Sequence, residues 1–217
     1  MSGLWIGLIA AGLCILAVVL YTLFISRKIS TPTRGTRIDQ SERPNTALVV
    51  IDVQEDFTRQ TGKNGFEPAS RDAALADINR NLAEARASGQ DIVFIKHVFQ
   101  DWWAIMAMKL LAGGVGTPGR EGLRLDPVLD VREAPIFEKA IGDAFSNAEF
   151  ENWLARREIG RLILTGLDAC QCVQLTARGG LARGYRVEVR EASTLTTTPE
   201  KWAGLKGELK LAGAEMS

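Results

Sequence analysis

The N-terminal segment from Leu4 to Ile25 contains no charged side chain and is almost entirely apolar. As a helix it would extend roughly 33 Å at ~1.5 Å per residue, which is enough to cross the hydrocarbon core of a bilayer. A cleaved signal peptide would carry basic residues before a shorter apolar core, whereas the basic residues here follow the run. We therefore expect residues 4–25 to form an uncleaved transmembrane anchor that stands outside any soluble fold.

The residues that flank this run predict its orientation. Lysine and arginine near a membrane-spanning helix favour the cytoplasmic side, and those nearest to the run follow it: Arg27, Lys28, Arg34 and Arg37. Trp5 and Tyr21 stand near its two ends, where aromatic residues favour the membrane interfaces. We expect a single-pass protein of the inner cell membrane whose remaining chain is cytoplasmic.

The polar segment 26–45 contains two prolines and shows no apolar periodicity, so it is typical of a flexible linker. Beyond it, residues 46–217 are enough for one domain with a substantial core, because 46% of the chain is hydrophobic and 24% is charged. The 26 basic and 26 acidic side chains cancel. This balance gives no electrostatic reason to expect a nucleic-acid partner.

Short apolar runs alternate with segments of helical periodicity through the predicted domain. The strand-like runs are 46–52, 91–98, 134–140, 161–167 and 185–192, and the helical segments are 71–89, 148–157 and about 172–183. Parallel strands need crossover connections that cover both faces of their sheet. The pattern predicts a three-layer α/β/α domain with a mainly parallel sheet of about six strands. The sixth strand is expected to be only residues 214–216, or absent.

In such folds ligands bind beyond the carboxyl ends of the strands. Asp52, His97, Lys139 and a turn with two cysteines occupy these positions. Cys172 would lie in the first turn of a helix, where the helix dipole favours a thiolate and a nearby lysine would lower the pKa of the thiol further. Cys170, within the turn, would point elsewhere. Taken singly, Asp52 could also cap the next turn and Lys139 could be a solvated charge.

Other functions of the cysteines have less support. A structural zinc site takes about four ligands, and outside the anchor the chain offers one histidine and two cysteines. We expect no metal and no other cofactor. The third cysteine, Cys14, lies in the anchor, and a reducing cytoplasm disfavours disulfides.

Three separated motifs resemble the isochorismatase-like cysteine hydrolases, the superfamily of nicotinamidases, N-carbamoylsarcosine amidohydrolases and ureidoacrylate amidohydrolases. They are ALVVIDVQEDF (47–57), FEKAIGDAFSNAEFENWL (137–154) and LILTGLDACQCVQLTARGGLARGY (162–185), with GTPG (116–119) as a weaker fourth. They occur in the family's order, and the resemblance covers essentially the whole predicted domain.

The resemblance implies a triad in which Asp52 is the general base, Lys139 its charged partner and Cys172 the nucleophile. It also implies an oxyanion hole formed by the backbone N–H groups of Asp168 and Cys172, and a cis peptide bond between Leu167 and Asp168. Such a site would hydrolyse a small amide-type C–N bond through a thioester. We expect the substrate pocket to be lined by Gln54, Phe57, His97 and Trp102.

Several features depart from the family's pattern. Ala169 stands where threonine is frequent, and Gly179–Gly180 stands where an Asp-Ala pair is frequent. The single histidine argues against a nicotinamidase, which usually has a histidine-containing metal site. Two alternatives to an amidase stay open: a catalytically weak scaffold module at the membrane, and an ether or ester hydrolase of the same fold.

The sequence also suggests contacts between copies of the chain. Trp102 and Trp103 begin an apolar segment that could be a lid, a subunit contact or ordinary core. Gly3, Gly7 and Ala11 have the small-xxx-small spacing that lets membrane helices pair. A homo-oligomer is therefore expected. The identity of the small-molecule substrate does not follow from the sequence.

Overall fold

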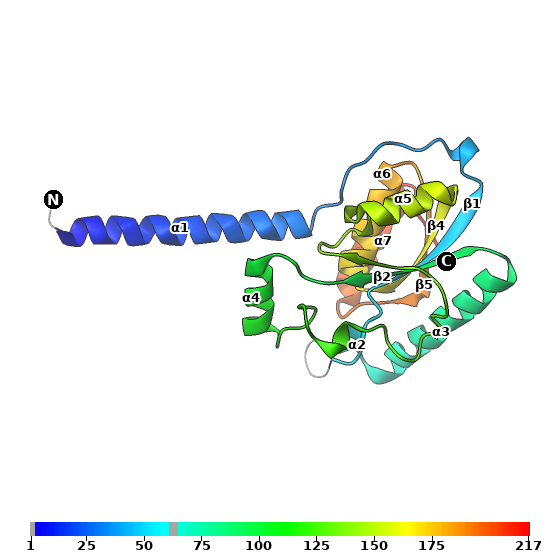
Figure 1. The fold of residues 1–217 in the computed structure, drawn as a ribbon, viewed down its shortest axis with the longest axis horizontal. Coiled ribbons are helices and arrows are strands. Elements are labelled where there is room, and N and C mark those ends of the chain that lie inside the picture. Colours follow the sequence, from blue (N-terminus) through cyan, green and yellow to red (C-terminus); the bar gives the residue numbers. More distant parts are fainter. Residues whose placement is uncertain (1–2, 61–64) are drawn as a thin grey trace.

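A computed structural model describes residues 3–60 and 65–217, and Figure 1 shows a single α/β domain with one long helix projecting from it. Six strands form one sheet in the order β3-β2-β1-β4-β5-β6, and every neighbouring pair is parallel. The strands are β1 Asn45–Ile51, β2 Asp91–His97, β3 Ile136–Lys139, β4 Ile159–Leu167, β5 Arg186–Leu195 and β6 Glu215–Met216. The predicted fold class is confirmed.

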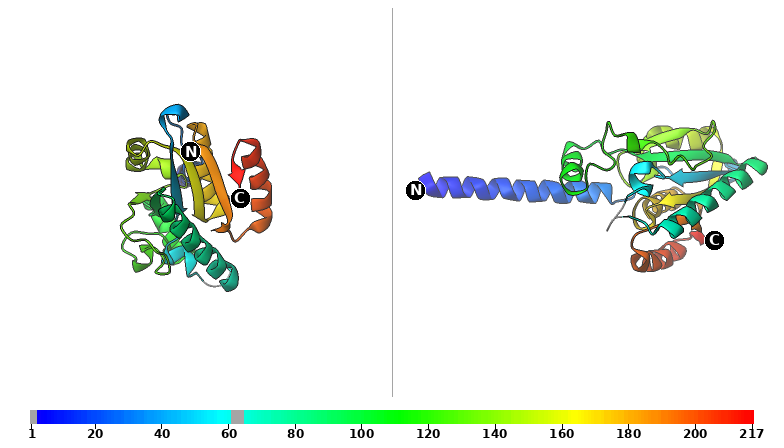
Figure 2. Two further views of the ribbon diagram at one scale, coloured as in Figure 1. Left: turned by 90° about the vertical axis from the view of Figure 1, so that its right-hand side faces the viewer. Right: turned by 90° about the horizontal axis from the view of Figure 1, so that it is seen from below.

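Helices cover both faces of this sheet (Figures 1 and 2). On one face lies α3 Pro68–Ala87, and on the other lie α5 Ala148–Arg156, α6 Gln174–Ala182 and α7 Pro199–Leu211. The remaining helices are α2 Glu55–Thr58 and α4 Trp102–Leu111. Successive side chains of a strand face opposite sides, so Val49 of β1 belongs to the core cluster beneath α5, α6 and α7. Its neighbour Val50 packs with α3 on the other side. The result is the expected three layers.

Local capping explains where some elements depart from the expected boundaries. Helix α3 begins at Pro68, ahead of the predicted residue 71, because the Glu67 side chain accepts hydrogen bonds from the N–H groups of Ala69 and Ser70. Helix α6 begins later than predicted, since residues Ala169–Val173 first form a π-helical turn. Cys172 therefore lies in this turn rather than in the first turn of the helix.

The sixth strand is present although it is short. Glu215 and Met216 pair with Glu188 and Val189 of β5. The final residue continues this pairing, because the N–H of Ser217 donates to the Val189 carbonyl.

Helix α1, Gly3–Ile29, projects from the domain along almost its whole length (Figure 1). Its part from Gly7 to Ile29 is long and apolar enough to cross a membrane, and only 6% of its most apolar stretch is buried. The helix continues beyond the predicted end of the anchor at Ile25. Ile25 is itself buried, because the final turns of α1 approach the domain.

The segment 30–44, which we call the strap, differs from the flexible linker expected at 26–45. It lies along the domain between α1 and β1 (Figure 1). The N–H and the hydroxyl of Thr33 each donate to Asp143 Oδ2 at 2.7 Å, and Arg183 donates to the Thr33 carbonyl at 3.0 Å. Asp143 and Arg183 are buried and need polar partners. The strap supplies some of these partners, and the same hydrogen bonds fix its backbone against the domain.

Candidate active site

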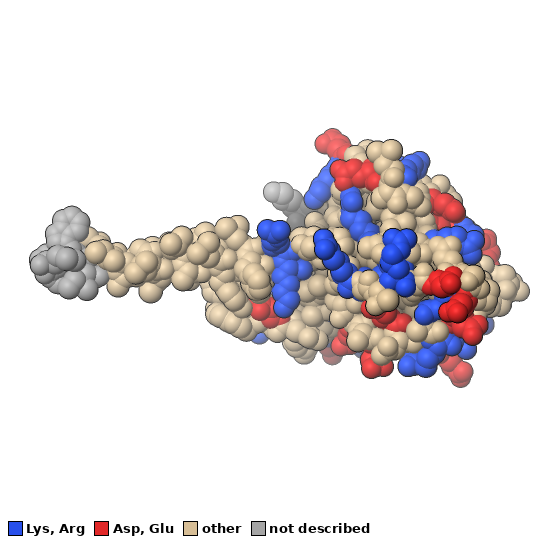
Figure 3. Space-filling view, turned by 90° about the horizontal axis from the view of Figure 1, so that it is seen from above, with Lys and Arg blue, Asp and Glu red and all other residues tan. Residues whose placement is uncertain are grey.

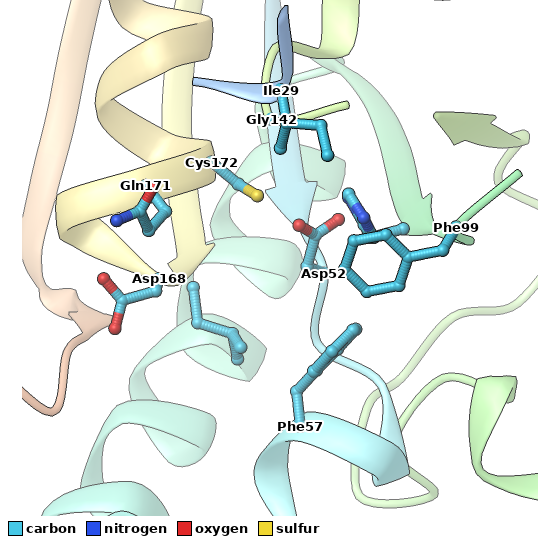
Figure 4. A pocket seen from close by; sticks show the side chains of 10 residues that line it. Ile29, Asp52, Phe57, Phe99, Gly142, Asp168, Gln171 and Cys172 are labelled. Atoms are coloured by element: carbon cyan, nitrogen blue, oxygen red, sulfur yellow. The ribbon is translucent and has the colours of Figure 1, made fainter. Parts of the chain in front are cut away.

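Four strands end at one edge of the sheet, and each brings a polar side chain to the same place. Asp52 follows β1, His97 ends β2, Lys139 ends β3, and Cys172 lies in the turn after β4. Asp52 has a left-handed backbone, with φ of 56°, which is uncommon outside glycine. Its N–H donates to the Ile95 carbonyl at 2.8 Å. Figure 4 shows Asp52 and Cys172 facing one cavity.

The ammonium group of Lys139 lies at the centre of this cluster. Its Nζ is 2.8 Å from Asp52 Oδ2, 2.9 Å from His97 Nδ1 and 3.1 Å from Cys172 Sγ. The Lys139 side chain is 0% exposed. A charge buried this completely requires an opposite charge and hydrogen-bond partners. Lys139 thus links the end of β3 to groups at the ends of β1, β2 and β4.

Burial and charge set the proton affinities of the cluster. Burial raises the pKa of the Asp52 carboxyl, although Lys139 opposes this effect. Burial alone would lower the pKa of Lys139, but its interactions with Asp52 and then with Cys172 raise it overall. Burial, and then the Lys139 charge, hold the pKa of His97 well below its ordinary value. His97 is therefore a neutral imidazole whose Nδ1 accepts from Lys139.

The pKa of the Cys172 thiol is raised far above its ordinary value, first by burial and then by the Asp52 carboxylate, with Lys139 opposing. The sequence-based expectation of a lowered thiol pKa is wrong. The sulfur is not in the first turn of α6, and a full negative charge lies beside it. In the resting site the proton is on sulfur and the charge pair is Asp52 with Lys139.

Two polar atoms of the cluster have no hydrogen-bond partner among the described residues. They are Asp52 Oδ1 and His97 Nε2, and both are buried. Buried polar atoms in folded proteins are normally paired. They leave one acceptor, on Asp52, and one ring nitrogen, on His97, for a ligand or for a proton in transfer.

The cavity in front of these groups has a volume of about 220 Å³. Its walls are Ile29, Asp52, Phe57, His97, Phe99, Gly142, Leu167, Asp168, Gln171 and Cys172. Most of the wall away from the cluster is apolar. Phe57 and His97, two of the residues predicted for the substrate pocket, line this cavity.

Two residues predicted for the pocket lie elsewhere. Gln54 is buried behind His97, and its amide accepts from the His97 N–H at 2.6 Å and donates to the carbonyl groups of His97 and Leu123. It holds the end of β2 in place. Trp102 is on α4, and its ring stacks on that of Tyr21.

Other wall residues were not foreseen. Phe99 follows β2 by two residues and could have been found with the strand-end rule. Ile29 was assigned to the linker.

The turn around Cys172 separates the two cysteines. The peptide bond between Leu167 and Asp168 is cis, as the family resemblance implied. The Asp168 carboxylate accepts from the Cys170 N–H at 2.7 Å. Cys170 is buried, and its sulfur contacts the hydroxyl of Thr198 at 3.3 Å, away from the cluster.

Asp52, His97 and Cys172 present possible metal-ligating atoms within 4.8 Å of one another. The Lys139 ammonium lies within 3.1 Å of one such atom on each of these residues. A cation held by the same atoms would be next to this ammonium, and the two would repel. The three side chains therefore fit a charged lysine and do not fit a metal ion.

Comparisons with known proteins give a consistent result. The family model for the isochorismatase domain matches residues 46–217. The ureidoacrylate amidohydrolase RutB of Pseudomonas syringae pv. syringae is 28% identical over 185 residues, which covers 71% of this chain and 72% of that protein. The isochorismatase family protein YddQ of Bacillus subtilis is 24% identical over 160 residues, which covers 70% of this chain and 79% of that protein.

Solved structures show the same fold. The pyrazinamidase/nicotinamidase of Streptococcus mutans has a TM-score of 0.68 at 23% identity, covering 80% of this chain and all of that one. An isochorismatase family protein from Desulfovibrio vulgaris has a TM-score of 0.70 at 22% identity, with coverage of 79% and 93%.

Proposed function

This chain belongs to the isochorismatase family of hydrolases, and from that premise we propose that it hydrolyses a small amide-type C–N bond through a thioester on Cys172. Relatives are named as amidohydrolases. The observation that carries the proposal is the buried Lys139 ammonium, which contacts both the Asp52 carboxylate and the Cys172 sulfur. The catalytic roles of these three residues are part of the proposal.

In the first half-reaction Asp52 takes the thiol proton while the Cys172 sulfur attacks the carbonyl carbon. The backbone N–H groups of Asp168 and Cys172 are the proposed donors to the oxyanion. The C–N bond then breaks, the proton on Asp52 moves to the leaving nitrogen, and ammonia or an amine departs. Cys172 is left as a thioester.

In the second half-reaction a water molecule attacks the thioester, and Asp52 takes its proton. The acid leaves and the proton returns to sulfur. The net change is addition of one water across the C–N bond, with no redox step.

The raised thiol pKa is compatible with this mechanism because Lys139 contacts both sites of negative charge. When the proton moves from sulfur to carboxylate, the charge moves from Asp52 to Cys172. The ammonium lies 2.8 Å from the first and 3.1 Å from the second. The Lys139 ammonium is therefore next to the negative charge before and after the transfer. Attack by sulfur and transfer of its proton can occur together, and the resting site needs no thiolate.

The test uses the full chain in lipid nanodiscs and a panel of small amides, imides and ureido compounds, with ammonia release as the readout. Ureido compounds are included because RutB relatives are named for ureidoacrylate. Cys172→Ala and Asp52→Asn should each lower kcat by about a thousandfold or more, as loss of such residues does in other acyl-transfer triads. Cys170→Ala, whose sulfur faces away, should retain activity.

Unchanged turnover in Cys172→Ala would overturn the proposal. A covalent acyl adduct on Cys172, trapped and identified by mass spectrometry, would support it and count against an ether hydrolase. Absence of turnover on every bond class, together with an unreactive Cys172, would favour the scaffold alternative.

The apolar helix is long enough to cross a membrane, and we propose that α1 anchors the protein with its domain on the cytoplasmic side. The exposed Arg27 and Lys28 in the last turn of α1 support this orientation. The expected homo-oligomer stays a prediction, which light scattering of the detergent-solubilised chain would test.

A further inference from the structure

Helix α4 presents large apolar side chains to the outside of the domain. Its sequence is WWAIMAMKLL, and Lys109 is its single charged residue. Trp102 is 58% exposed, Met106 56%, Leu110 84% and Leu111 80%. The first three are four residues apart and share one face of the helix. A contiguous apolar surface of this kind usually marks contact with a partner or a membrane.

Helix α4 lies against the part of α1 nearest the domain, and Figure 1 shows it crosswise to α1. Tyr21 donates from its hydroxyl to Asp101 Oδ2 at 3.2 Å. Trp103 donates from its indole N–H to Thr22 Oγ1 at 3.1 Å. A helix that crosses a membrane-spanning helix at this place would lie along the membrane surface.

Three aromatic side chains form a cluster where α4 contacts α1. The rings of Tyr21, Trp102 and Trp103 have centroids 5.3 to 6.4 Å apart. Tyrosine and tryptophan are enriched where hydrocarbon meets headgroups. Arg27 and Lys28 follow on α1, between this cluster and the domain. Figure 3 shows lysine and arginine side chains where α1 enters the domain and none along the described outer part of α1.

The position of α1 relative to the pocket is held by direct contacts. The N–H of Gly142 donates to the Ile29 carbonyl at 3.1 Å, and the strap continues the attachment at Thr33. Gly142 and Ile29 are both in the pocket wall. Tyr21 precedes Ile29 by roughly two helical turns, about 12 Å along the axis. This part of the pocket wall therefore lies about 12 Å from Tyr21 along the axis of α1.

A second hollow continues the pocket toward α4. It shares Phe57, Phe99, Leu167 and Asp168 with the catalytic cavity. Its far wall includes Met108 of α4 together with Ala112 and Val115 just beyond it. The two hollows thus adjoin through these shared residues. The second one carries Gln60, Asp168 and Thr197 beside its apolar side chains, and its apolar part offers a surface for an alkyl chain.

We propose that α4 lies in the membrane interface and that the pocket takes amides with a long apolar chain directly from the bilayer. The substrate part of this inference rests on the proposed reaction, and the seating of α4 rests on the proposed anchoring by α1. The basic residues Arg27 and Lys28 lie between the aromatic cluster and the domain, and Tyr21 of α1 and the two tryptophans of α4 lie together. Both features favour a lipid surface as the partner of the exposed face of α4.

The seating of α4 is tested with an environment-sensitive fluorophore on a single cysteine. The background is the full chain with Cys14→Ala, Cys170→Ala and Cys172→Ala, in nanodiscs. Leu111→Cys on α4 is compared with Leu211→Cys on α7, because both leucines are highly exposed, 80% and 92%. Brominated lipids should quench the label at 111 at least about threefold more than the label at 211. Equal quenching at 111 and 211 would overturn the proposal that α4 lies in the membrane interface. It would also be overturned if the label at 111 were shielded from water only when a second copy of the chain is present.

Access from the bilayer is tested without any hydrolysis, by labelling Cys172 with N-ethylmaleimide or N-decylmaleimide in nanodiscs. Cys14, exposed on α1, serves as an internal reference for the probe dissolved in the bilayer. Peptide mapping gives the rate at Cys172 relative to Cys14. In the wild type the decyl probe should be favoured at Cys172 by about tenfold or more.

The combined variant Leu110→Glu, Leu111→Glu should abolish most of this preference, whereas Leu211→Glu should leave it unchanged. Both variants replace only exposed leucines, so the fold should be preserved in each. A preference that survives in the α4 variant would overturn the proposed route. If the preference behaves as expected and no amide is hydrolysed, the proposed reaction fails while the membrane route stands.

Discussion

At the residue scale, the neighbours of Cys172 lead to a prediction in which reactivity and turnover change in opposite directions. Burial and then the Asp52 carboxylate raise the pKa of the thiol. Asp52→Asn removes the charge and leaves Lys139 in place, so the pKa should fall. At a pH below the pKa, each unit of decrease gives about tenfold more thiolate. Alkylation of Cys172 by iodoacetamide at pH 8 should become faster, while hydrolysis is lost.

The control for this prediction is Cys170 in the same protein. Its sulfur contacts Thr196 and Thr198 instead of the Asp52 cluster. Its labelling rate should be the same in wild type and variant. In the variant the rise of Cys172 labelling with pH should shift to lower pH; slower or unchanged labelling would show that Asp52 does not control the thiol.

The strand-end rule was sufficient to bring Asp52, His97, Lys139 and Cys172 together, because parallel strands end at one edge of their sheet. The rule says nothing about solvent exposure or about the distance between two charges. The direction of the thiol pKa depends on both, and the sequence-based expectation was wrong there. Trp102 was misplaced for a related reason: it is close in sequence to β2, but its ring packs on Tyr21 of α1 and does not line the cavity.

At the element scale, Gly179 in α6 explains one of the departures from the family pattern. A Cβ atom at this position would overlap the Asp143 carboxylate, which binds the strap. Overpacking of this kind costs about 1–3 kcal/mol, and the better helix propensity of alanine offsets about 1 kcal/mol of it. The net cost is about 0–2 kcal/mol, so Gly179→Ala should lower the Tm of the full chain in detergent by up to about 8 °C.

Gly207 in α7 provides the matched control, because nothing lies within 4 Å of the place that a Cβ atom would occupy there. Gly207→Ala should raise the Tm by about 2–4 °C through helix propensity alone. A Tm for Gly179→Ala that rises as much as that of Gly207→Ala would show that Asp143 does not restrict this site.

The strands and most helices followed from the sequence because their apolar periodicity reflects burial on one or both faces. The π-helical turn at Ala169–Val173 did not, since its hydrogen bonds depend on one residue, Asp168. Its carbonyl accepts from the N–H groups of Gln171 and Val173, and its carboxylate accepts from that of Cys170. The strap was also missed, because a polar segment without periodicity can be held by buried partners such as Asp143 and Arg183.

At the scale of the whole molecule, the anchor and the basic residues after it predict a defined topology. After expression in a bacterium, the full chain should stay in the membrane pellet through an alkaline carbonate wash. Protease added to intact spheroplasts should leave the domain undigested, and it should digest the domain once the membrane is opened. A shortened soluble chain would instead indicate a cleaved signal sequence, and digestion in intact spheroplasts would indicate the opposite orientation.

With α1 in the membrane as proposed, the attachment of Ile29 and Thr33 to the domain leaves little slack between membrane and pocket. A catalyst held in this way would search for its substrate by lateral diffusion in two dimensions. Its rate should then follow the mole fraction of a long-chain amide among the lipids. At a fixed total amount of amide, adding inert phospholipid should reduce turnover through surface dilution, while hydrolysis of a short, water-soluble amide should not change.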